Sequence, residues 1–212
     1  MTKIYLEQGK TKIVACSLEW PGWCRFGKTQ ETALAALLDS APRYRVIAER
    51  AGVDFAPEAF VVVEQVIGDS TTDWGAPSLI TTTDTHPVDG TSARQGVALL
   101  QASWMIMDEV VASSPSELRK GPRGGGRERD KVVSHVIDVE RAYARKIGVQ
   151  QKPFPFGDVA SLAAMRKKIA AILSQPSDGS LLASGGWPTT YAIRRFTWHV
   201  IDHIWEIEDR QV

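Results

Sequence analysis

Three of the four histidines in this chain stand where their imidazoles could share one metal ion. His199 and His203 are four residues apart in the segment 191–210, so in a helix they stack one turn apart. Their common direction lies about 80° from the centre of the apolar stripe, at the boundary of the buried face. Two such imidazoles can bind one cation of Zn, Ni, Cu or Fe. A half-buried polar pair without a metal is the alternative.

His135 supplies the third imidazole of the predicted site. It lies at the edge of the apolar stripe of another expected helix, formed by Val132, Val136, Val139, Tyr143 and Ile147. Bundle cores place metal ligands on facing helices, which favours a shared site. Spacing alone supports a metal site and ordinary boundary histidines equally. The fourth histidine, His86, precedes Pro87 in a loop-like segment and is not expected to take part.

The elements that must position these histidines are four amphipathic helices in the second half of the chain. Segments rich in Pro, Gly and Ser separate them. The helices are expected at residues 92–112, 127–147, 158–174 and 191–210. Four helices of this length predict a four-helix bundle over residues 91–212.

The first ninety residues predict a smaller α+β unit. Strands are expected at 13–18, 24–26 and 60–66, and a helix begins after the cap residue Thr29 and is interrupted at Pro42. This ββαβ module covers residues 1–68. Residues 69–90 are rich in Thr, Asp, Gly and Pro and read as a linker, so the fold class is α+β.

Two helical segments resemble the DinB/YfiT-like superfamily. Residues 130–143 (DKVVSHVIDVERAY) resemble its second-helix signature, in which a histidine is followed five residues later by Glu-Arg and then an aromatic residue. Residues 198–206 (WHVIDHIWE) resemble its last-helix histidine pair, and the resemblance covers about residues 91–210. It implies an up-down-down-up-type bundle with a nickel or zinc site and bound water, whose ligands would be His135, His199 and His203.

The same resemblance implies small-molecule chemistry. The superfamily includes mycothiol-dependent isomerases and bacillithiol or glutathione S-transferases. In the isomerase branch a Glu replaces one ligand of the last helix, whereas this chain has His at both positions. We therefore expect a metal-dependent enzyme acting on a small molecule, like a thiol S-transferase or a hydrolase. The alternative is a non-catalytic, metal-stabilised binding or dimerisation module, and either role is compatible with a homodimer.

Carboxylates near the histidines could orient imidazoles or move protons. Glu206 lies on the same side of its helix as His199, within roughly 20°, and is the candidate catalytic residue. A plain solvated charge is its alternative. Asp202 points further toward solvent, so pairing with a Lys or Arg and a role at the site are equally open. Asp138 and Glu140 are further candidates on the helix of His135.

The N-terminal module has a weaker resemblance, to HicB-type antitoxins. Pro21-Gly22-Trp23-Cys24 followed by Gly27-Lys28-Thr29-x-x-x-Ala33 matches their turn and helix start in outline. Any ββα unit with a tight turn and a capped helix would look similar, and no toxin partner can be inferred.

Composition limits the remaining functions. Lys plus Arg equals Asp plus Glu, 25 each, so no net charge attracts nucleic acid or an anionic membrane. Without an apolar run that spans a bilayer or a signal-like N-terminus, a cytoplasmic protein with reduced Cys16 and Cys24 is expected. The basic, glycine-rich segment from Arg119 to Arg129 is either an anion-binding loop or a solvated one.

Overall fold

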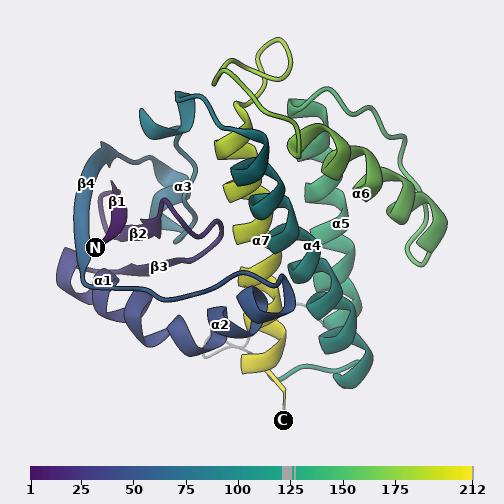
Figure 1. Cartoon of the computed structure of the whole chain (residues 1–212). Coiled ribbons are helices and arrows are strands. Elements are labelled where there is room, and N and C mark those ends of the chain that lie inside the picture. The colour runs from purple at the N-terminus through teal and green to yellow at the C-terminus, as the bar shows by residue number, and fades with distance from the viewer. Residues whose placement is uncertain (121–125, 127, 212) are drawn as a thin grey trace.

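The computed structural model describes residues 1–120, 126 and 128–211 (Figure 1). One four-stranded sheet and, within these residues, seven α-helices make a mixed α+β structure. The predicted fold class is confirmed at this level.

The sheet contains one strand more than the sequence pattern predicts. Its order is β3-β2-β1-β4, and β1 is antiparallel to β2 but parallel to β4. The strands span β1 Thr2–Gln8, β2 Ile13–Ser17, β3 Cys24–Gly27 and β4 Phe60–Ile67. The expected ββαβ order omits β1 because charged Lys3 and Glu7 interrupt a short apolar run. The strand could have been predicted from the alternation of Thr2, Ile4 and Leu6, which are buried in the sheet.

Two helices, α1 (Gln30–Asp39) and α2 (Ala41–Arg50), connect β3 to β4. The Thr29 side chain accepts a hydrogen bond from the Thr32 amide and caps α1, as predicted. The expected interruption occurs at Ser40, and Pro42 lies in the first turn of α2, where its missing N–H costs nothing.

The segment 69–90 is anchored to the sheet and to the last helix, and it contains a short helix, α3 (Ser70–Asp73), and a 3₁₀ turn, η1 (Thr83–Thr85). Buried Glu7 accepts hydrogen bonds from the Thr72 hydroxyl at 2.5 Å and the Ser78 amide at 3.0 Å. Buried Asp84 pairs with Arg194 at 2.5 Å. These contacts hold the segment in place although little of it is regular.

The second half of the chain consists of four long helices that pack against one another. They are α4 (Gly90–Ser113), α5 (Arg129–Lys146), α6 (Val159–Leu173) and α7 (Thr189–Asp209), each within three residues of its predicted bounds. Helix α7 contacts α4, α5 and α6 and lies between the sheet and α5 (Figure 1). Most of the basic segment between α4 and α5 lies outside the described residues, including Gly121, Pro122 and Arg123.

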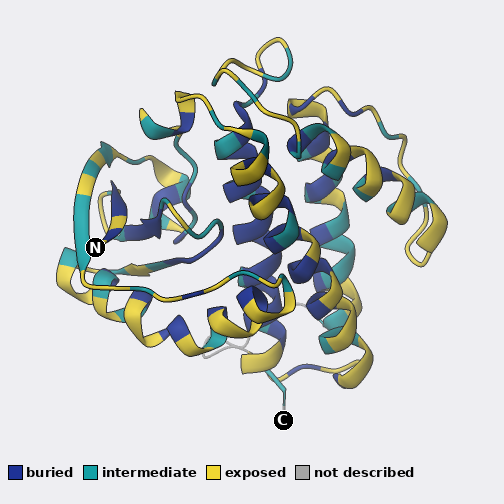
Figure 2. Ribbon diagram, viewed as in Figure 1, coloured by how far each residue is buried: buried dark blue, intermediate teal, exposed yellow. Residues whose placement is uncertain are grey.

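One cluster of buried apolar side chains extends from the sheet and α1 through α7 to the other long helices (Figure 2). Trp104, Trp198 and Trp205 are buried. The division into residues 1–68, 69–90 and 91–212 stays a prediction. Side chains from the first and the third of these segments share one core cluster. Among the described residues, no helix is long and apolar enough to cross a membrane.

Candidate metal centre

The three histidines come together from two helices. His135 lies on α5, and His199 and His203 lie on consecutive turns of α7. The two helices run in opposite directions, since the ring of His135 contacts that of His203 while Tyr143, further along α5, contacts His199. The predicted ligand set is thus assembled at one level of the interface between α5 and α7.

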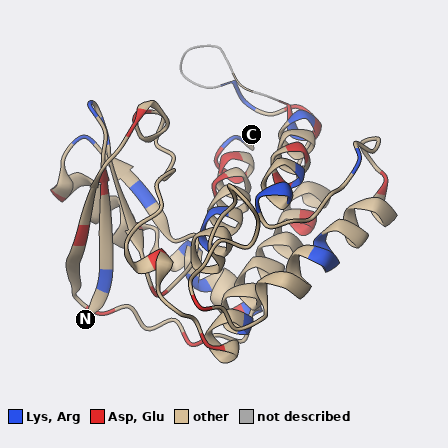
Figure 3. Cartoon of the chain, turned by 90° about the horizontal axis from the view of Figure 1, so that it is seen from above, with Lys and Arg blue, Asp and Glu red and all other residues tan. Residues whose placement is uncertain are grey.

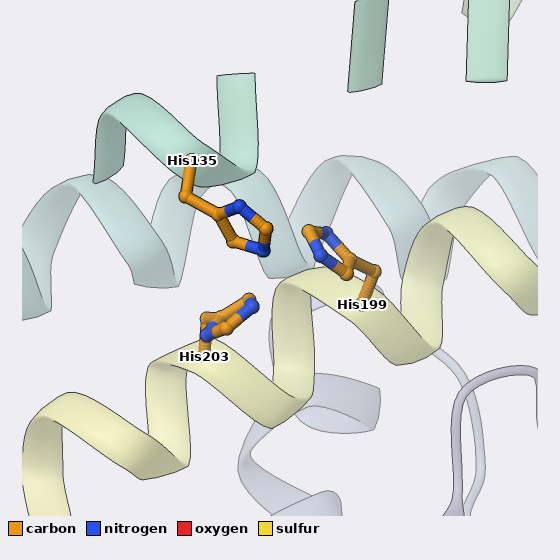
Figure 4. Close-up of side chains that lie close together, drawn as sticks. All are labelled: His135, His199 and His203. Carbon is orange, nitrogen blue, oxygen red and sulfur yellow. The ribbon is translucent and has the colours of Figure 1, made fainter. Parts of the chain in front are cut away.

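The imidazoles face a common space (Figure 4). Their ring centroids are 5.3 Å apart for His135 and His199, 5.1 Å for His135 and His203, and 4.7 Å for His199 and His203. One nitrogen from each ring lies within 4.8 Å of the other two. A tetrahedral metal bound at about 2.0–2.1 Å needs nitrogens about 3.4 Å apart, so small ring rotations would close the site.

The three imidazoles are largely shielded from solvent. His199 is 6% exposed and His203 is 9% exposed, while His135 is half-buried. Neutral imidazole nitrogens are ligands for Zn, Ni, Cu and Fe, whereas Mg and Ca prefer oxygen. A set of three imidazole nitrogens therefore fits a transition-metal ion such as Zn, Ni, Cu or Fe better than Mg or Ca.

Glu206 stands behind His203. Its Oε2 lies 2.7 Å from Nδ1 of His203, and its Oε1 accepts a hydrogen bond from Arg210 at 3.0 Å. The hydrogen bond from His203 is the main cause that lowers the pKa of Glu206; burial opposes it, and Arg210 adds a smaller lowering. A carboxylate can only accept, so Nδ1 of His203 carries the proton and Nε2 is left for a metal.

The other carboxylates considered from sequence each pair with an arginine. Asp202 is 3.9 Å from Arg25, with a side chain 43% exposed, and this pairing with a basic residue is one of its two alternatives from sequence. Asp138 pairs with Arg141 at 2.9 Å on the exposed face of α5. Glu140 is buried and bonds to Trp104 and Arg166, so it joins α5 to α4 and α6 rather than serving the histidines.

Tyr143 and Arg195 lie beside the histidines and were not predicted from the sequence as site residues. The Tyr143 ring packs edge-on against His199 at 5.7 Å, and the Arg195 guanidinium lies 5.5 Å from the centre of that ring. Burial raises the pKa of the Tyr143 hydroxyl, and nearby Arg195 partly opposes this. The position of Arg195 could have been predicted, because it precedes His199 by four residues and therefore lies on the same side of α7.

Both cysteines belong to an apolar cluster with Tyr5, Val14 and Trp198. Cys16 and Cys24 face each other across β2 and β3, and both are buried and free. Burial raises the pKa of the Cys16 thiol, which disfavours the reactive thiolate. Both thiols are free, as the sequence predicts, and pack as small apolar groups.

Comparison with known proteins returned no relatives: no protein-family model, curated protein or solved structure matches the chain.

Proposed function

We propose that His135, His199 and His203 bind one divalent transition-metal ion, nickel or zinc, in a DinB-like four-helix bundle formed by α4 to α7. The observation that carries the proposal is the convergence of three imidazoles, from two helices, to within 4.8 Å of one another. Burial of His199 and His203 adds support. Protonated imidazoles that lie close together and largely away from water repel one another, whereas neutral imidazoles can share one bound cation.

We further propose a metal-dependent enzyme acting on a small molecule, by transfer to or from a thiol or by hydrolysis. Three protein ligands leave a position for substrate or water, whereas structural zinc sites have four ligands. When bound, the metal would supply a Lewis acid. Within this chain, Glu206 would hold the proton on Nδ1 of His203 and direct Nε2 toward the site, which makes Glu206 a positioning residue rather than a proton donor.

A non-catalytic role has its own support. The ligands come from two helices that are distant in sequence, so a bound ion would clip α5 to α7 and stabilise their contact. Loss of thermal stability on chelation, with no reaction across a panel of thiol and ester substrates, would favour this module over an enzyme. A nucleic-acid role has no comparable support, since Lys/Arg and Asp/Glu segments are mixed over both halves of the molecule (Figure 3).

The direct test is elemental analysis of untagged protein purified without chelator. One equivalent of nickel or zinc per chain is expected, and none in His135→Ala. His86→Ala is the matched control, because His86 is exposed on the segment that precedes α4 and should leave the metal content unchanged. Metal-free wild-type protein that also takes up no added ion would refute the proposal.

A further inference from the structure

Arg195 belongs to the same row of side chains as two of the three histidines. Arg195, His199 and His203 are spaced by four residues along α7, so each lies about one turn, roughly 6 Å, beyond the last. On α5 the residues that face this row include His135 and, eight positions later, Tyr143. The interface between these helices thus holds the histidines at one level and Arg195 beside Tyr143 at the next.

Arg195 forms no direct ion pair with a described carboxylate. Its guanidinium donates to the carbonyl of Pro77 and lies 4.7 Å from the centre of the Trp198 ring. None of the described carboxylates is within 4.0 Å of it, although the side chain is half-buried. Its charge acts at longer range on Asp202, where it partly offsets the burial that raises the pKa of that carboxyl. A half-buried cation without a direct ion pair can still gain from an anionic ligand.

Neighbouring arginines show the contrast. Arg194 pairs with Asp84 at 2.5 Å, and Arg210 pairs with Glu206 at 3.0 Å. Arg25 has Asp202 at 3.9 Å. Arg195, which is half-buried on α7, instead contacts two aromatic rings and a carbonyl and forms no ion pair within 4.0 Å with a described acid.

We infer that Arg195, assisted by the Tyr143 hydroxyl, binds the carboxylate of a small organic acid whose other end reaches the metal position at the three histidines. This inference rests on the proposed metal site and names its substrate class. A planar guanidinium matches the two oxygens of a carboxylate, and most of its five N–H groups are not used by Pro77. Aromatic walls from Tyr143 and Trp198 limit water around the ion pair and strengthen it.

The test uses cobalt-loaded full-length protein, because the visible spectrum of bound Co²⁺ reports ligands that enter its coordination sphere. Malonate, succinate and glutarate are titrated against acetate, propionate, butyrate and valerate, which carry one carboxylate. At least one dicarboxylate should bind about tenfold more tightly than the monocarboxylate of equal length, since a charge-assisted hydrogen-bond pair contributes roughly one tenfold step or more. In Arg195→Gln the preference should vanish while the monocarboxylate affinity stays the same.

Tyr143→Phe should keep part of the preference, and Arg195→Lys should keep charge but lose the paired geometry. Arg145→Gln, an exposed arginine of α5, is the matched control and should behave as wild type. Equal affinities for the two series, or a preference that survives in Arg195→Gln, would overturn the inference. Wild-type protein that binds no Co²⁺ would instead refute the metal site, and this inference with it, so the two failures are distinguishable.

Discussion

Replacing Glu206 by alanine tests how the carboxylate acts on the proposed metal site. In wild-type protein Glu206 receives Nδ1–H of His203 at 2.7 Å and is itself held by Arg210 at 3.0 Å. Without it, the His203 ring can rotate or present its proton on Nε2, and either change removes a prepared ligand. Loss of such a hydrogen-bond partner typically weakens metal binding about 10–100-fold. This corresponds to about 1.4–2.7 kcal/mol.

The assay is competition for zinc between the protein and a chromophoric chelator at pH 7.5, where neutral imidazole predominates. Glu208→Ala is the control, because Glu208 lies two residues away on α7 and pairs with Arg43 at the surface. Circular dichroism of both variants checks that α7 remains helical. A zinc affinity for Glu206→Ala within twofold of wild type would show that the contact does not position the ligand, and the role assigned to Glu206 would be wrong.

Three further outcomes are expected. Removing the metal with a chelator should lower the melting temperature, because an ion present at a hundred times its Kd adds about 2.7 kcal/mol to the free energy of unfolding. Metal affinity should fall as the pH is lowered from 7.5 to 5.5, since protons compete with the ion for the same imidazole nitrogens. Asp84→Ala should destabilise the fold by about 3–5 kcal/mol, because Arg194 would stay buried without its partner.

Each of these outcomes has a control and a contradicting result. In His135→Ala the chelator should leave the melting temperature unchanged, and an equal shift in that variant would mean that metal binds elsewhere. An affinity that is constant between pH 7.5 and 5.5 would argue against histidine ligands. Asp54→Ala, at an exposed position after α2, should cost less than about 0.5 kcal/mol in denaturant unfolding. A similarly small loss in Asp84→Ala would show that the buried ion pair is not needed for stability.

The local elements were well predicted, for reasons that lie in short-range chemistry. Thr29 caps α1, Pro42 opens α2, and the apolar periodicity marks the four long helices to within three residues at either end. The prediction failed at β1, a central strand whose apolar pattern is interrupted by the charged residues Lys3 and Glu7. Glu7 is tolerated there because Thr72 and Ser78, far along the chain, donate hydrogen bonds to it. No window of sequence around β1 contains those donors.

The sequence alone determined that His199 and His203 lie one turn apart, because helix geometry relates residues four positions apart wherever the helix sits. It also indicated that His135 and Glu206 belong near them. Only the tertiary structure decided that α5 runs antiparallel to α7 with His135 at the level of His203, and that Arg195 meets Tyr143 one turn away. Those arrangements depend on how buried faces pack across the whole core, and periodicity within one helix carries no information on the partner it meets.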